Sequence, residues 1–192
     1  METSNLALLT GKIYQSKLSL FTVKTLRDLL GKEVSDAAFF SALARLVSQN
    51  ILQKLEREKY ALVGGQRHDF GVANFLYEPS YVSLAAALNF YGVLSQFPYE
   101  IASITPRKPV VKTIDGKIFR YTRIKKSLFW GYELLDGFLI AQPEKALLDL
   151  LYLTSKGLAV VHADELNMSK LDRARFHLYA KKFPALKETD IL

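Results

Sequence analysis

The chain has 192 residues, of which 49% are apolar, and it carries a formal net charge of +7 with no cysteine. This length and apolar content favour one compact domain or two small ones and exclude an intrinsically disordered chain. The lack of cysteine excludes disulfide scaffolds, thiol nucleophiles and cysteine-bound zinc, and no apolar run reaches the roughly 20 residues of a membrane span.

The first 65 residues predict three short helices, a brief strand at Leu18–Phe21 and a terminal hairpin. The expected helices are Ser4–Gln15, Thr22–Leu30 and Ser35–Gln49, and the expected hairpin strands are Ile51–Leu55 and Lys59–Val63. Thr22 and Ser35 are residue types that cap helix N-termini. This order of elements is typical of a winged helix-turn-helix, in which the third helix enters the DNA major groove and the hairpin lies along the backbone.

The third helix is expected to bury Phe39, Leu43, Leu46 and Val47 and to expose its other side. On that side, Ser41 and Arg45 are candidates for contacts with base edges or phosphates. Residues 35–63 contain four cations and three acids, and two of the acids, Glu56 and Glu58, lie at the expected hairpin tip. Because phosphate attraction depends on cations near the DNA backbone, use of this unit for protein contacts remains an open alternative.

A Gly-Gly-Gln-Arg segment at residues 64–67 indicates a linker, so the predicted domains are 1–65 and 66–192. In the second domain, Ser83 is expected to cap a helix that ends at Gly92. Glu100–Thr105 is expected to form a strand.

The whole surplus of positive charge lies in Thr105–Lys126. This stretch has eight cations and one acid, which leaves 18 of the chain's 26 basic residues and 18 of its 19 acidic residues elsewhere. Its Asp115-Gly116 pair, between β-branched and aromatic residues, predicts a β-hairpin. With its cations on one face, this basic hairpin would attract anions such as the phosphate backbone of a nucleic acid. The alternative is a solvated edge strand that its lysines protect from pairing. The eight cations are Arg107, Lys108, Lys112, Lys117, Arg120, Arg123, Lys125 and Lys126.

Residues 127–192 predict strands at Phe129–Glu133 and Phe138–Ala141, a long apolar helix that begins at Pro143, and a last helix over Ser169–Phe183. Within the apolar helix, Asp149 is either a functional buried carboxylate or a partnered group at the helix edge. The fold class is therefore α+β. A winged helix-turn-helix is followed by a mixed α/β domain with a small, largely antiparallel sheet.

No catalytic or cofactor motif is evident, so we expect no enzyme activity, no metal and no cofactor. His68, His162 and His177 lie far apart without ligand-like spacing, and no glycine-rich phosphate loop or nucleophile elbow occurs. The N-terminus lacks the pattern of a signal peptide, which favours a cytoplasmic protein. A nuclease or transferase built from scattered carboxylates stays open. These carboxylates are Asp69, Glu100 and Asp115.

A set of runs in the second domain is recognisable as a group. The runs are Leu76–Leu84, Ala87–Gly92, Phe119–Tyr121, Phe129–Tyr132 and the signature Ile140–Tyr152. Together they resemble the AbiEi family, the antitoxins of type IV (abortive-infection) toxin–antitoxin systems. The resemblance is close over residues 74–153 and loose over the first domain.

The resemblance implies a DNA-binding winged helix and a C-terminal domain that counteracts a nucleotidyltransferase-like toxin. It also implies a repressor that binds inverted repeats in the promoter of its own operon. The residues onto which it places the DNA-reading role are Ser41, Arg45, Lys54, Arg57 and Lys59. An alternative is a non-enzymatic interaction module that binds toxin or RNA through the basic hairpin, while the winged helix makes protein contacts and forms a homodimer.

Overall fold

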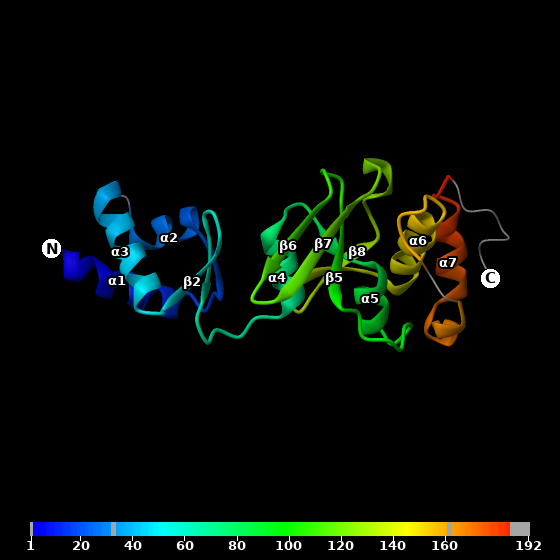
Figure 1. Ribbon diagram of the computed structural model, residues 1–192, viewed down its shortest axis with the longest axis horizontal. Helices are drawn as coiled ribbons and strands as arrows, with labels where there is room; N and C mark the ends of the chain where they lie inside the picture. Colours follow the sequence, from blue (N-terminus) through cyan, green and yellow to red (C-terminus); the bar gives the residue numbers. More distant parts are fainter. Residues whose placement is uncertain (1, 32–33, 161–162, 185–192) are drawn as a thin grey trace. The chain divides into compact units, whose positions relative to one another are not determined.

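The computed structural model describes residues 2–31, 34–160 and 163–184, which form an α+β protein (Figure 1). The chain divides into two compact units, Met1–Arg67 and His68–Leu192. This division falls two residues after the predicted boundary, because the guanidinium of Arg67 is bound within the first unit. It donates hydrogen bonds to the Leu62 carbonyl and to Gln53 Oε1, each at 3.2 Å.

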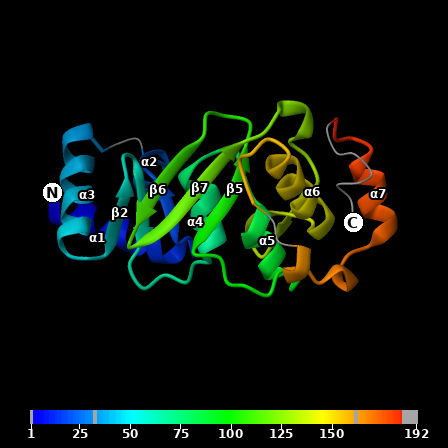
Figure 2. The same ribbon diagram turned by 45° about the vertical axis from the view of Figure 1, so that its right-hand side comes forward.

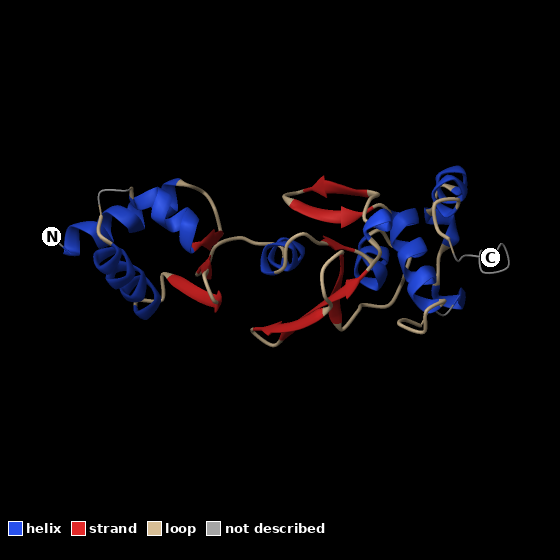
Figure 3. Ribbon diagram, turned by 90° about the horizontal axis from the view of Figure 1, so that it is seen from above, coloured by secondary structure: helices blue, strands red, loops and turns tan. Residues whose placement is uncertain are grey.

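The first unit consists of three helices and a three-stranded antiparallel sheet in the order β1-β3-β2. Its elements are α1 (Glu2–Gln15), β1 (Leu20–Thr22), α2 (Val23–Leu30), α3 (Asp36–Ser48), β2 (Leu52–Glu56) and β3 (Lys59–Leu62). The helices lie on one side of the small sheet (Figure 3). Their apolar positions recur at helical spacing, so Leu9, Leu26, Leu43 and Leu46 meet in one buried core.

The predicted caps of the second and third helices are confirmed. Thr22 Oγ1 accepts a hydrogen bond from the Thr25 amide at 3.0 Å, and Ser35 Oγ accepts one from the Ala38 amide at 3.3 Å. Each cap satisfies a backbone donor that the first helical turn leaves unpaired. Asn50 follows α3 with φ 56°, a left-handed conformation that asparagine tolerates and that turns the chain into β2.

The second unit contains a six-stranded mixed sheet in the order β6-β7-β5-β4-β9-β8. Its strands are β4 (Tyr81–Val82), β5 (Glu100–Thr105), β6 (Val110–Ile114), β7 (Lys117–Arg123), β8 (Tyr132–Leu135) and β9 (Phe138–Ala141). The pairs β5–β7 and β4–β9 are parallel, and the other three are antiparallel. Three of the five strand pairs are thus antiparallel, but the sheet is mixed rather than largely antiparallel, because crossovers place β5 parallel to β7 and β4 parallel to β9.

The second unit also contains α-helices that pack on this sheet or on one another. They are α4 (Asp69–Leu76), α5 (Leu84–Phe90), α6 (Pro143–Thr154) and α7 (Arg173–Ala180), with short 3₁₀ turns at Lys126–Leu128, Ala163–Glu165 and Met168–Lys170. α4 packs on β4, β5 and β9, whereas α6 packs between α5 and α7 (Figure 2). Almost every residue of α6 is buried, so the predicted apolar helix is the central helix of the unit.

Three features of the second unit differ from the sequence prediction. Helix α4 was not predicted, because Asp69–Leu76 contains Gly71 and lacks a clear polar face. The strand expected at Phe129–Glu133 is displaced to Tyr132–Leu135. The last helix, α7, is shorter than the predicted Ser169–Phe183, and within it Phe176 is buried while Leu178 is exposed.

Candidate nucleic-acid interface

The exposed side of α3 presents Ser41 and Arg45 one helical turn apart. Arg45 is exposed and Ser41 is half-buried, while Phe39, Leu43 and Leu46 on the opposite side lie in the core. This separation follows from residues four apart sharing one face of a helix. The two predicted residues thus share a surface with the exposed ring of Phe40.

An ion pair neutralises the acid at the start of α3. The guanidinium of Arg27 on α2 binds Asp36 Oδ1 and also lies 4.8 Å from the ring centroid of Phe39. Asp36 favours the positive end of the helix dipole, but alone it would repel a phosphate. The pairing with Arg27 removes that repulsion from the N-terminal end of α3.

The β2–β3 hairpin carries the other three predicted DNA-binding cations in different environments. Lys54 and Arg57 are exposed, whereas Lys59 is half-buried and bonds Glu56 at 2.8 Å. The Arg57 guanidinium also lies 3.8 Å from Glu58. The two acids at the hairpin tip therefore offset part of its positive charge, and Lys54 and Arg57 are the cations that extend furthest into solvent.

The prediction that the basic hairpin gathers its cations on one face is wrong. Side chains alternate along a strand, so Lys117 and Phe119 of β7 lie on the face that packs against α4, and Arg120 lies on the other face. The register places Lys112 beside Phe119 and Val111 beside Arg120, which extends the same division across β6. The cations therefore do not form a single anion-binding surface.

On the face toward α4, the hairpin side chains bind this helix along its whole length. Lys117 Nζ bonds Asp69 at 2.6 Å, the Tyr121 hydroxyl donates to the Ala73 carbonyl at 2.6 Å, and Lys112 Nζ donates to the Leu76 carbonyl at 2.7 Å. The acid lies in the first turn of α4 and the Lys112 ammonium at its last carbonyl, so both charges suit the helix dipole. These cations stabilise the fold.

Two further cations of the basic hairpin are also engaged. Arg120 Nε bonds both carboxylate oxygens of Glu100 on β5, at 2.6 and 2.8 Å. Arg107 donates to the Glu78 carbonyl at 2.6 Å, and its guanidinium lies 4.5 Å from the Tyr77 ring centroid. Within the described part of the chain, the remaining four side chains have no hydrogen-bonding or ionic partner. They belong to Lys108, Arg123, Lys125 and Lys126.

The two units differ in net charge, and the acids that pair with the basic hairpin belong to the second unit. The first unit has ten Lys and Arg and six Asp and Glu, a net charge of +4. The second unit, outside Thr105–Lys126, has eight Lys and Arg and twelve Asp and Glu, a net charge of −4. The neutral remainder of the sequence thus combines a basic first unit with an acidic part of the second unit, from which Asp69 and Glu100 pair with the basic hairpin.

Replacing Lys112 with Met is expected to lower the free energy of unfolding of the second unit by about 1–2 kcal/mol, because the Leu76 carbonyl loses a charged donor. Lys108→Met is the matched control, since its exposed ammonium has no partner in the described chain, and it should change stability by less than about 0.5 kcal/mol. Urea denaturation followed by Trp130 fluorescence measures both. Equal effects would contradict a structural role for Lys112.

A buried polar network lies inside the second unit around Asp149, for which the sequence left two alternatives, a functional buried carboxylate or a partnered group at the helix edge. Asp149 is fully buried and accepts hydrogen bonds from Lys145, from the Tyr81 hydroxyl at 3.0 Å and from Ser83 Oγ at 2.9 Å. Lys145 Nζ also donates to the Tyr81 hydroxyl at 2.8 Å and lies 5.2 Å from the Trp130 ring centroid. Ser83 begins α5, but its hydroxyl binds Asp149 rather than capping the helix.

Burial is the largest cause of the pKa shifts of Asp149 and Lys145 in this network. It raises the pKa of Asp149 and lowers the pKa of Lys145, and their mutual attraction opposes both shifts. Both side chains have no exposed surface, so no substrate reaches them and the network is structural. The spacing of four between Lys145 and Asp149 on a predicted helix was the signal that could have identified the pair.

Other polar residues around the signature Ile140–Tyr152 join α6 to α7. Glu144 Oε1 accepts a hydrogen bond from the Asp172 amide at 2.8 Å, at the start of α7. Gln142 Oε1 accepts one from the Tyr179 hydroxyl at 2.6 Å. Gln142, Glu144, Lys145 and Asp149 of the signature therefore hold the elements of the second unit together.

The scattered carboxylates considered for catalysis do not converge. Asp69 bonds Lys117 on one face of the sheet and Glu100 bonds Arg120 on the other, while Asp115 lies in the hairpin turn with φ 51°. His68 Nδ1 accepts from the Phe70 amide and caps α4. His177 is exposed, and His162 lies outside the described residues.

Within residues 2–31, 34–160 and 163–184, no three side chains of the metal-ligating types gather into a group that could hold an ion. No helix there is both long enough and apolar enough to cross a membrane.

Comparison with known proteins gives a likeness of fold. No family model matches the sequence, and no curated protein matches it. Among solved structures, the chain is similar to the RV2827C protein from Mycobacterium tuberculosis, with a TM-score of 0.62 and 15% sequence identity. The match covers 94% of this chain and 72% of that one. At this identity the likeness concerns the fold alone, and the chain shares an α+β architecture with that protein.

Proposed function

We propose that the first unit is a winged helix that binds promoter DNA, and that the chain is the antitoxin and autorepressor of a type IV toxin–antitoxin operon. The observation that carries DNA binding is the exposed side of α3, where Ser41 and Arg45 lie one turn apart. The order of three helices and a hairpin supports the winged helix. The net charge of +4 on this unit and the pairing of Asp36 with Arg27 favour approach to phosphates.

The test is a fluorescence anisotropy titration with DNA from upstream of the gene and with scrambled DNA, at several salt concentrations. We expect tighter binding to the promoter DNA. Arg45→Ala is expected to raise its Kd by about 5- to 150-fold, the effect of losing about 1–3 kcal/mol of base contact. Arg57→Gln is expected to weaken both DNAs alike and to lower the salt slope by about 1, the effect of one lost phosphate contact.

The matched control is Arg173→Ala, which removes an exposed arginine from the second unit. It should leave both affinities unchanged. Equal affinity of the wild-type chain for promoter and scrambled DNA would contradict the autorepressor proposal, because it would leave only sequence-independent phosphate binding.

The antitoxin part of the proposal rests on the runs that resemble AbiEi proteins in the second unit. Its test is co-expression with a nucleotidyltransferase-like toxin from the same operon, in which growth should recover. The alternative, an interaction module that works through the basic hairpin, has less support, because Lys112, Lys117 and Arg120 bind within the chain. Arg123→Glu separates the two, since this exposed side chain has no partner in the described structure. Loss of neutralisation with intact promoter binding would favour the alternative.

A further inference from the structure

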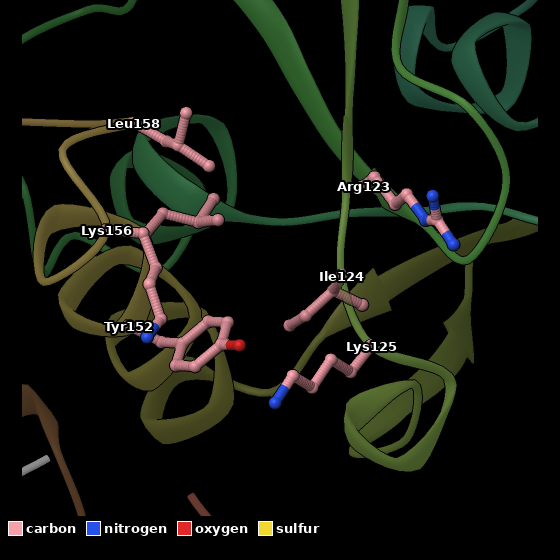
Figure 4. A pocket seen from close by; sticks show the side chains of 7 residues that line it. Arg123, Ile124, Lys125, Tyr152, Lys156 and Leu158 are labelled. Carbon is pink, nitrogen blue, oxygen red and sulfur yellow. The ribbon is translucent and has the colours of Figure 1, made fainter. Parts of the chain in front are cut away.

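A small pocket of about 220 Å³ lies between the end of β7 and the end of α6 (Figure 4). The described residues that line it include three cations and no acid. They are Arg123, Ile124, Lys125, Tyr152, Leu153, Lys156 and Leu158. The side chains of Lys125 and Ile124 extend toward Tyr152, whereas Arg123 points away from it (Figure 4). The Lys156 ammonium lies 5.7 Å from the Tyr152 ring centroid.

The polar groups at this pocket have no partners in the described chain. Neither the Lys125 nor the Lys156 ammonium bonds a carboxylate there. Tyr152 is only 5% exposed, yet its hydroxyl bonds no described residue and is directed toward the pocket (Figure 4). The hydroxyl is not one of the buried side-chain atoms of the described chain that lack a partner, so this end of the tyrosine is accessible at the pocket. Two ammonium groups and one hydroxyl are thus available to a ligand that accepts hydrogen bonds and carries negative charge.

The size of the pocket limits what it can hold. It is smaller than the roughly 300–1,000 Å³ of pockets for drug-sized ligands, which suits one charged group. Leu158 also lines a neighbouring cavity of about 410 Å³ over β6 and β7, together with Val111 and Thr122. A ligand bound by its charged end at Lys125 and Lys156 therefore has space for an organic body beyond Leu158.

We propose that this pocket binds the phosphate group of a small phosphorylated molecule through Lys125, Lys156 and the Tyr152 hydroxyl. Two lysines provide charge-assisted hydrogen bonds to phosphate oxygens, and the tyrosine adds a neutral donor. The site is independent of DNA binding by the first unit. It lies entirely in the second unit, and it uses Lys125, a cation of the basic hairpin whose side chain has no partner in the described chain.

The experiment is a titration of the full chain with inorganic phosphate and with AMP, followed by amide shifts in ¹H–¹⁵N spectra at constant ionic strength. We expect saturable shifts in Arg123–Lys126 and Tyr152–Leu158, with tighter binding of AMP. The double variant Lys125→Gln, Lys156→Gln should weaken both ligands at least about tenfold, through lost charged hydrogen bonds. Tyr152→Phe should weaken them by a smaller factor.

Lys126→Gln is the matched control, because this neighbouring exposed lysine does not line the pocket, and its binding should equal that of the wild-type chain. Adenosine, which lacks the phosphate, should cause no saturable shift. An oligonucleotide without a terminal phosphate distinguishes a nucleic-acid backbone from a small ligand. Binding of that oligonucleotide alone, or phosphate binding unchanged in the double variant, would overturn the proposal.

Discussion

Replacing Asp149 with Leu is expected to lower the free energy of unfolding of the second unit by about 3–5 kcal/mol, and Lys145→Met to lower it by a similar amount. Each single change leaves a fully buried charge without its partner, which is the costly half of a buried ion pair. The double variant should recover more than half of the loss, because apolar side chains then replace both charges. Full recovery is not expected, since Tyr81 and Ser83 lose their acceptor.

Trp130 makes this measurement specific to the second unit. It is the only tryptophan in the chain, and its ring centroid lies 5.2 Å from the Lys145 ammonium. Urea denaturation followed by its fluorescence gives the stability of each variant. Lys170→Met, at an exposed lysine of the same unit, should change stability by less than about 0.5 kcal/mol. Single variants within that range, or a double variant as unstable as the summed singles, would contradict a coupled pair.

The Lys145→Met defect should also depend on pH. Burial raises the pKa of Asp149 above its unfolded value, so the folded state binds a proton more tightly than the unfolded chain does. The stabilising effect of that proton is present at low pH and is lost as pH rises through the folded pKa. Lys145 opposes this rise, so its removal raises the Asp149 pKa further, and protonation at lower pH stabilises the variant more than the wild-type chain. The defect should therefore shrink as pH is lowered.

Gly131→Ala is expected to destabilise the second unit by about 2–5 kcal/mol. Gly131 has φ +74°, a conformation that costs an L-residue about 1–2 kcal/mol. An added Cβ would also lie 2.9 Å from Lys145 Cγ. Because the Lys145 ammonium is bound by Asp149 and Tyr81, its stem cannot move away, which adds about 1–3 kcal/mol of overpacking.

Gly137→Ala separates the two contributions to this effect. Gly137 has a similar φ of +84° in the β8–β9 turn, but no atom lies within 4 Å of its added Cβ. We expect it to lose only the backbone part, about 1–2 kcal/mol. Urea denaturation of both variants measures the difference, and equal losses would show that the contact with Lys145 has no energetic effect.

The sequence predicted local structure well where the chemistry of single residues decides it. Asp115-Gly116 marked the hairpin and Thr22 and Ser35 marked helix starts, because turns and caps depend on adjacent residues. The sequence could also have shown that the hairpin cations lie on both faces of the sheet, although one face was predicted. Lys117 and Arg120 are three residues apart on a strand, so they had to lie on opposite faces.

Contacts between distant segments could not be read from the sequence. Asp69 and Glu100 become partners of Lys117 and Arg120 only through the crossovers of the mixed sheet. The surplus of cations in Thr105–Lys126 therefore suggested a free basic surface, whereas the fold uses Lys117 and Arg120 of this stretch in ion pairs. The phosphate pocket was equally hidden, because it joins Lys125 to Lys156 across 31 positions of sequence.

The cap that His68 places on α4 has a practical consequence for anyone who wishes to cut the protein in two. A fragment meant to hold the second unit has to include His68, since a later start would expose the first amides of the helix to which the hairpin is bound. A fragment meant to hold the first unit has to retain Arg67, whose guanidinium anchors the end of β3.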